Sequence, residues 1–146
     1  MAKLLWKPSQ ERINNTNLKR FMDFINIKHE QNFIEYDTLY RWSIDHISDF
    51  WASMWEFADI KASAPYTEVI DDPQKMPGAK WFTGARLNFA ENLLRYRDDH
   101  VALIFKGETQ ASVKMTYAEL YKEVAQVARS LKDSGVREGD RMVGFM

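Results

Sequence analysis

Three histidines are the first candidates for chemistry in this sequence: His29, His46 and His100. No two of them stand four residues apart, which would place both imidazoles on one helical face, and no third ligand accompanies them, so the spacing predicts no metal site. His46 directly follows Asp45, and a carboxylate can orient a histidine that acts as a base. Because adjacent residues on a helix point in different directions, we favour a solvated helix end for this pair.

Paired acidic residues and a group of arginines are the next candidates. Asp71–Asp72 and Asp98–Asp99 each lie beside turn-forming residues, which favours a role within the loop over a catalytic carboxylate pair. Three arginines could contact a phosphate group, although surface solvation is the interpretation that we favour: Arg86, Arg95 and Arg97.

Motifs that hold phosphates or activate a nucleophile are absent from the sequence. The patterns G-x-x-x-x-G-K-[ST], G-x-G-x-x-G and G-x-S-x-G do not occur. The chain has no cysteine, which excludes disulfides, thiolate metal sites and a cysteine nucleophile. We therefore assign no catalytic, cofactor-binding or metal-binding residue, and the residues alone leave open whether the chain is an enzyme.

The composition is that of an ordinary globular protein, with 146 residues, 45% hydrophobic and 28% charged. The net charge is −1, so no strong positive field would attract nucleic acid or an anionic membrane. The apolar runs are far shorter than the roughly 20 residues needed to cross a bilayer, and the N-terminus does not resemble a signal peptide. We expect a cytoplasmic protein without a nucleic-acid or membrane partner.

Aromatic residues make up 14% of the chain, and five of them cluster between residues 42 and 57. A stacking platform for a cofactor or a base usually comes with a basic groove, and none is visible here. We therefore interpret the cluster as a helical core packed with large rings. The five are Trp42, Phe50, Trp51, Trp55 and Phe57.

The first third of the chain predicts helices. Residues 1–15 read as an irregular arm, and N-cap residues around Thr16 begin a helix that runs to about Lys28. Asp37 is the expected cap of a second helix. Ser48 opens a third, which ends near Asp59. The apolar stripe of this third helix consists of Trp51, Met54, Trp55 and Ala58.

Residues 61–84 contain prolines and glycines that interrupt regular structure, so we expect an extended segment with at most a short strand at 67–70. The segment WFTGARLN at 81–88 is interpreted as packing, with Asn88 as a helix cap and Glu91 as its capping-box partner. Leu93 and Leu94 are expected on the buried side of that helix.

The last third predicts a hairpin followed by a helix. The run VALIF at 101–105 and residues 112–115 are expected to pair across a turn at 107–110. Both alternating sets of VALIF are apolar, which predicts a strand covered on both faces. Thr116 and Glu119 form a capping box, and apolar residues then follow at helical spacing. They are Tyr117, Leu120, Tyr121, Val124, Val127, Ala128 and Leu131.

Gly135 stands where that helix needs a left-handed residue to end, and residues 142–146 are expected to form the next strand. A strand, a helix and a strand in this order predict a right-handed crossover. The expected fold class is therefore mixed α/β. A helical N-terminal extension precedes a β-hairpin and a right-handed β-α-β unit that starts a larger sheet.

Four segments resemble the beginning of the acetoacetyl-CoA synthetase family of adenylate-forming acyl-CoA synthetases. These segments are LWKPSQERI at 5–13, YDTLYRWSIDHISDFWASMWEF at 36–57, KWFTGARLNFAENLLRY at 80–96 and MTYAELYKEVAQVARSLKDSGVREGDRMVGFM at 115–146. The pattern WF…LN…AENLLR is shared in weaker form with acetyl- and propionyl-CoA synthetases. The LWKPS opening and the LYRWS…DFW block look closer to the enzymes that activate acetoacetate.

The resemblance implies an N-terminal helical and extended region at 1–97 and the beginning of the large AMP-binding domain at 98–146. Such an enzyme joins acetoacetate to ATP, releases pyrophosphate and transfers the acyl group from AMP to coenzyme A, with Mg²⁺ as the assisting cation. The phosphate loop and the catalytic lysine of the family lie beyond the last residue given, so no site residue is carried over. We expect ATP, Mg²⁺ and coenzyme A to serve the whole enzyme and none of them to bind this piece tightly.

The apolar run at the end of the sequence predicts an incomplete chain, and the resemblance implies that it is the front part of a ligase, inactive by itself, with the rest of the adenylation domain as its partner. Exposed strand edges would then lead to self-association. Two alternatives stay open: an accessory or protein-interaction module, and the same region of an acetyl- or propionyl-CoA synthetase.

Overall fold

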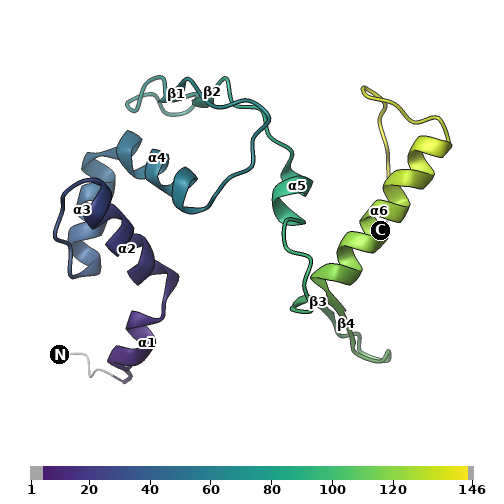
Figure 1. Cartoon of the computed structure of the whole chain (residues 1–146), viewed down its shortest axis with the longest axis horizontal. Helices are drawn as coiled ribbons and strands as arrows, with labels where there is room; N and C mark the ends of the chain where they lie inside the picture. Colours follow the sequence, from purple (N-terminus) through teal and green to yellow (C-terminus); the bar gives the residue numbers. More distant parts are fainter. Residues whose placement is uncertain (1–4, 145–146) are drawn as a thin grey trace. The chain divides into compact units, whose positions relative to one another are not determined.

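The computed structural model describes residues 5–144. They divide into two compact units, one that ends at Leu87 and one that begins at Asn88 (Figure 1). Each unit is described by itself. The sequence predicts a different division, into family regions 1–97 and 98–146. That division stays a prediction.

Two capped helices open the first unit. Helix α1 (Gln10–Asn14) lies within the predicted irregular arm, so that prediction was wrong for these five residues. The cause is local: the Ser9 hydroxyl accepts a hydrogen bond from the Arg12 backbone N–H at 3.2 Å, which makes Ser9 a helix cap. Helix α2 (Asn17–Lys28) begins after Thr16, whose hydroxyl accepts from the Lys19 N–H at 3.1 Å, as predicted.

The next two helices are the predicted ones, with shifted starts. Helix α3 (Tyr36–Asp45) begins after Glu35, so Asp37 is not its cap but lies in the first turn, where its charge suits the helix dipole. Helix α4 (Ile47–Phe57) begins after His46, one residue before Ser48. Asp59 follows its last turn with a φ of 49°, and the helix therefore ends close to the predicted residue.

The core of the first unit lies among α2, α3 and α4. It is built around five buried side chains, Phe21, Met22, Ile25, Leu39 and Trp42, with partly buried Phe24, Phe33, Phe50, Met54 and Phe57 packed against them. The Phe21 ring centroid lies 5.1 Å from that of Phe57 and 5.7 Å from that of Phe50, in edge-to-face geometries that aromatic pairs prefer. The interpretation of the aromatic cluster as a packed core is confirmed for Trp42, Phe50 and Phe57, whereas Trp51 and Trp55 lie outside this core.

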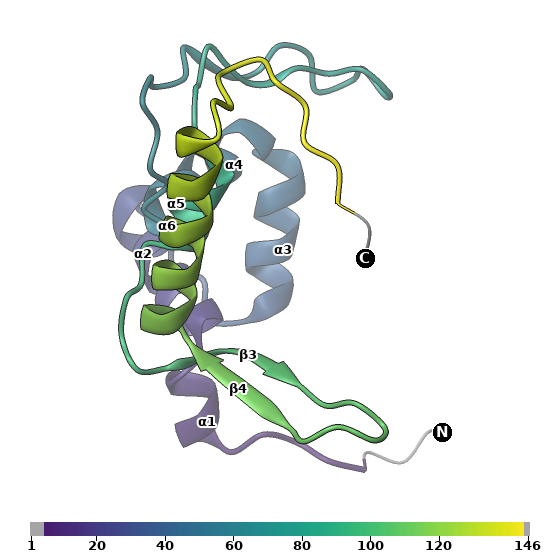
Figure 2. The same ribbon diagram turned by 90° about the vertical axis from the view of Figure 1, so that its right-hand side faces the viewer.

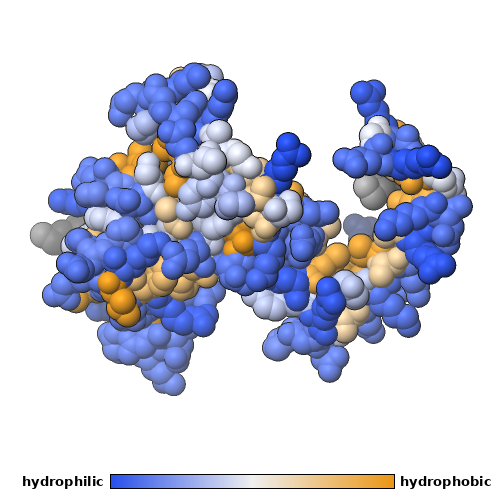
Figure 3. All heavy atoms as spheres, turned by 45° about the horizontal axis from the view of Figure 1, so that its top comes forward, coloured by the Kyte–Doolittle hydropathy of each residue, from blue (hydrophilic) through white to orange (hydrophobic). Residues whose placement is uncertain are grey.

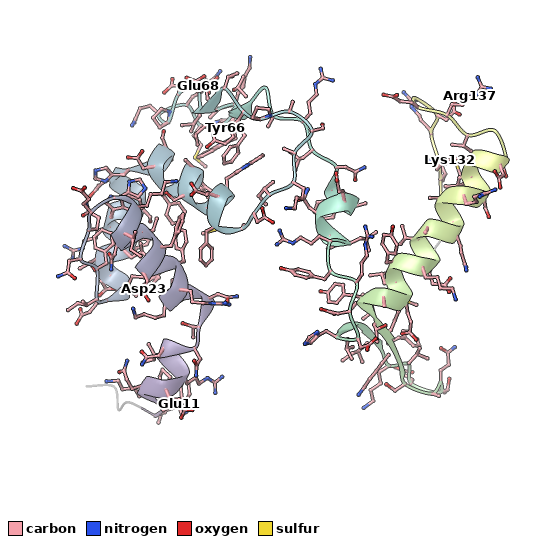
Figure 4. All side chains as sticks on the ribbon, in the orientation of Figure 1. Glu11, Asp23, Tyr66, Glu68, Lys132 and Arg137 are labelled. Carbon is pink, nitrogen blue, oxygen red and sulfur yellow. The ribbon has the colours of Figure 1, made fainter. Side chains whose placement is uncertain are left out.

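Helix α4 has a second aromatic face, toward the extended segment. Strands β1 (Glu68–Ile70) and β2 (Trp81–Thr83) pair antiparallel in this segment, with Glu68 opposite Thr83 and Ile70 opposite Trp81. Figure 4 shows the labelled Tyr66 below this strand pair, on the side of α4. The predicted stripe of α4 is thus divided, because Met54 packs on the core whereas Trp51 and Trp55 contact rings of the extended segment.

The second unit begins with helix α5 (Phe89–Leu93). The side chain of Asn88 accepts a hydrogen bond from the Glu91 N–H at 3.2 Å, which confirms Asn88 as the cap. Leu94 is buried, whereas Leu93 is 53% exposed. The prediction for Leu93 was wrong because α5 ends at this residue and has too few turns to present a continuous buried stripe.

A β-hairpin and a long helix follow (Figure 2). Strands β3 (Val101–Phe105) and β4 (Val113–Thr116) pair antiparallel, with Phe105 opposite Val113. Helix α6 (Tyr117–Asp133) has the predicted capping box, in which the Glu119 N–H donates to the Thr116 hydroxyl and the Thr116 N–H donates to the Glu119 carboxylate at 2.8 Å. The hairpin and the helix confirm the mixed fold class.

The end of α6 has the geometry expected from Gly135, whose φ is 88°. The Gly135 N–H donates to the Lys132 carbonyl and the Val136 N–H to the Leu131 carbonyl, both at 3.0 Å, the two bonds of a Schellman motif. A turn then closes through a bond from the Asp140 N–H to the Arg137 carbonyl at 3.1 Å. Helix and turn therefore end where the sequence predicts.

Two expectations for the sheet are not met. Residues 142–144 form no strand, and residues 145 and 146 lie outside the described part, so the β-α-β crossover is absent from residues 5–144. Strand β3 is not covered on both faces, since Leu103, Ile104 and Phe105 are all more than half exposed. Both differences have the same cause. Within the described residues β3 pairs with β4 alone, and residues 142–144 have no neighbouring strand with which to form backbone hydrogen bonds.

No helix of the described chain is long and apolar enough to span a bilayer.

Candidate functional site

The two histidines of the first unit, His29 and His46, both contact Trp42. The Nε2 atom of His29 lies 2.8 Å from the hydroxyl of Ser53, which is fully buried, and its ring lies 5.0 Å from the Trp42 ring. His46 turns away from the neighbouring Asp45: its Nδ1 atom is 3.3 Å from the Trp42 carbonyl, and its ring stacks on that indole. Trp42 is thus contacted by the imidazole at the end of α2 and by the imidazole at the end of α3.

No metal centre forms among residues 5–144, since no three histidine, aspartate or glutamate side chains come together there. His100 pairs only with Asp98, at 3.2 Å between Nδ1 and the carboxylate, and its side chain is largely exposed. Asp98 also accepts from the His100 backbone N–H at 3.1 Å. The loop interpretation of this acidic pair agrees with the structure.

The Asp71–Asp72 pair also organises its own loop. The Asp71 carboxylate accepts hydrogen bonds from the backbone N–H groups of Lys80 and Asp72, both at 2.8 Å. The bond from Lys80 is the main cause that lowers the pKa of Asp71. Asp72 accepts from the Gln74 N–H at 2.9 Å. Each carboxylate therefore accepts hydrogen bonds from backbone N–H groups of the loop, and the bond from Lys80 to Asp71 links the end of β1 to the start of β2.

The three arginines have separate surroundings. The Arg97 guanidinium lies 3.9 Å from the ring centroid of Tyr121, and that of Arg95 lies 5.1 Å from the ring of Tyr96. Arg86 takes part through its backbone in a bridge with Ala64, where its N–H donates at 3.1 Å. Within the second unit, Arg95 and Arg97 therefore each contact the ring of a different tyrosine.

The segment WFTGARLN fastens the extended segment to α4. The Phe82 ring centroid is 4.7 Å from that of Trp55 and 5.3 Å from that of Tyr66, while Trp55 and Tyr66 are also 5.3 Å apart. We name these three rings the aromatic clasp. Phe82 has a φ of 48°, which is unfavourable for a bulky residue, so the ring contacts offset a strained backbone. The hydroxyl of the next residue, Thr83, is buried without a hydrogen-bond partner in the described chain.

The second unit has an apolar helix surface in place of a chemical site. Val124, Val127, Ala128 and Leu131 line a shallow hollow of about 330 Å³ with Glu123 at its margin. We name the first four residues the α6 face. Val127 is 58% exposed although it lies in the middle of the helix. The helical spacing in the sequence identified these residues, but it could not show that residues 5–144 leave them uncovered.

The hairpin continues this exposure of apolar side chains. Five of its residues are about half exposed or more: Val101, Leu103, Ile104, Phe105 and Val113. Figure 3 shows hydrophobic surface interspersed with hydrophilic residues on the face in view. Strand β3 contacts helix α6, whose first residue donates its backbone N–H to the His100 carbonyl just before the strand. An apolar surface of this kind is typical of a docking site for protein and carries no group that could perform catalysis.

Comparison with known proteins gives this surface a context. Residues 36–93 match the family model described as the acetyl-coenzyme A synthetase N-terminus. The chain is 40% identical over 148 residues to acetoacetyl-CoA synthetase from Danio rerio and 33% identical over 142 residues to acetoacetyl-coenzyme A synthetase from Rhizobium meliloti. These matches cover 99% and 97% of the chain. Malonamoyl-CoA synthetase from Penicillium aethiopicum is 31% identical and is matched over 98% of the chain.

A solved structure agrees with the sequence comparison. Acetoacetyl-CoA synthetase from Streptomyces lividans matches 97% of the chain with a TM-score of 0.81 and 39% sequence identity. The chain spans only 22% of that protein's length, and 22% of the length of the Danio rerio and Rhizobium meliloti relatives.

Proposed function

The chain has the sequence and the fold of the N-terminal region of acetoacetyl-CoA synthetases, within the AMP-forming acyl-CoA synthetases, and from this premise we propose that it serves as that region of an ATP-dependent acetoacetate–CoA ligase. One observation carries the proposal: both the sequence match and the fold match extend over nearly the whole chain. The reaction joins acetoacetate, ATP and coenzyme A through an acyl-adenylate to give acetoacetyl-CoA, AMP and pyrophosphate. A cytoplasmic location accompanies this proposal.

In this proposal ATP, Mg²⁺ and coenzyme A serve the whole ligase. Residues 5–144 contain no cluster of carboxylates for a cation, and the sequence contains no glycine-rich phosphate loop. We therefore place cofactor binding and catalysis in other parts of the ligase, and we propose that the 146 residues are inactive alone. Their contribution is a folded body and an apolar surface for the remainder of the enzyme.

The choice of acid belongs to the proposal as well. The matching family model is named for acetyl-coenzyme A synthetase, which supports acetate or propionate as a second candidate. The identity to several acetoacetyl-CoA synthetases over the whole chain favours acetoacetate. An accessory module that binds another protein is a further candidate, and the exposed α6 face is the observation that favours it.

The test begins with the reading frame that contains this sequence. We expect it to continue past Met146 into a phosphate loop rich in glycine, serine and threonine. The protein from the complete frame should release pyrophosphate when it is supplied with acetoacetate, ATP, Mg²⁺ and coenzyme A. Acetate and propionate, each supplied in place of acetoacetate, should give at least about tenfold lower kcat/KM, a discrimination of about 1.4 kcal/mol.

The isolated 146 residues are the control, and they should release no pyrophosphate above background. Turnover by this piece would contradict the proposed division of roles. A native stop codon after Met146 would support the accessory module instead. A preference for acetate or propionate would keep the ligase and change the acid.

A further inference from the structure

We draw no further inference here: the strongest candidate, the exposed stripe of Tyr36, Tyr40 and Ile44 along helix α3 of the first unit, is an unpartnered apolar helix face, and nothing in the structure shows what covers it.

Discussion

At the residue scale, Ser53 is the most informative polar group of the first unit. It is fully buried in α4, and its hydroxyl lies 2.8 Å from Nε2 of His29. In the sequence it is an ordinary serine within a helix, and the helical pattern gives no reason to expect a partner from α2. Long-range pairs such as this depend on how helices cross, which a local pattern does not contain.

Ser53→Ala should therefore lower the free energy of unfolding of the first unit by about 1 kcal/mol, the contribution of one hydrogen bond. Urea unfolding followed by near-ultraviolet circular dichroism, which reports the packing of aromatic rings, gives the measurement. Ser48→Ala, at an exposed position of the same helix, is the control and should change stability by less than about 0.5 kcal/mol. Equal effects of the two substitutions would show that the contact with His29 contributes nothing.

Glu119 gives the second residue-scale prediction, for pH. Its pKa is lowered, chiefly by the hydrogen bond from the Thr116 backbone N–H. In the unfolded chain the carboxyl has its ordinary, higher pKa, so the unfolded state binds the proton first as the solution is acidified. The stabilisation is therefore complete above the ordinary glutamate pKa and is lost as the pH falls through the lowered one.

Circular dichroism of α6 between neutral and acidic pH measures this effect. Glu119→Gln keeps the capping geometry and removes the titration, so the variant should lose less helix on acidification than the parent chain. Glu123→Gln removes one charge from the same helix and should leave the acid dependence in place. The same slope for Glu119→Gln and the parent would contradict the assigned role of the capping box.

At the element scale, the correct predictions were those that rest on residues close together in the sequence, such as helix caps. Thr16, Asn88, Thr116 and Gly135 specify helix ends through bonds to residues three or four positions away, and the structure contains all of them. Helix α1 was missed although Ser9 is a cap of the same kind. Where a signal depended on a distant partner, the described chain does not provide that partner: residues 142–144 form no strand, and β3 is exposed, as expected for a strand without its later neighbours.

The aromatic clasp is an element-scale feature that can be tested directly. Phe82→Ala removes the ring that contacts both Trp55 and Tyr66, and the strained backbone at this position loses its compensation. The strand pair β1–β2 should then detach from α4, and trypsin should cleave after Lys75 and Lys80 at least about tenfold faster than in the parent chain.

Phe89→Ala is the matched control for the clasp, because it removes the same ring from a side chain that is 78% exposed. Tryptic digestion sampled over time and analysed by mass spectrometry compares the two. Cleavage after Lys75 at the parent rate in Phe82→Ala would show that the strand pair holds the segment without the rings.

At the scale of the whole molecule, the two units differ in how much core each possesses. The first has a cluster of buried side chains from three helices, whereas the described second unit buries little beyond Leu94. Amides of α2 and α4 should therefore be protected from hydrogen exchange by at least about a hundredfold more than amides of α6. Mass spectrometry of peptic fragments at neutral pH measures the difference, and equal protection would mean that α6 is covered in the free chain.

Self-association is a prediction at the same scale, and the sequence alone already motivates it. The exposed hairpin edge and the α6 face offer apolar contacts to a second copy. We expect sedimentation at tens of micromolar to show species larger than a monomer, and Val127→Asp to shift them toward the monomer. A single monomeric boundary for the parent chain would contradict this expectation.

The candidate site was the least predictable part of the molecule. The sequence contains no phosphate-loop motif and no cysteine, and the resemblance of four segments indicated a family that the comparisons confirm. That the α6 face is uncovered could not be foreseen, because helical spacing predicts which residues lie together and cannot tell what lies opposite them.

The position of the tryptophans has a consequence for any optical study of this chain. Trp6, Trp42, Trp51, Trp55 and Trp81 all precede Leu87, and tyrosine is the strongest emitter that the second unit possesses. Indole emission thus reports on one half of the molecule and is silent on the other. A thermal unfolding curve recorded from tryptophan emission would follow the first unit alone, even if the hairpin and α6 had already unfolded. The emission wavelength therefore determines which unit is observed.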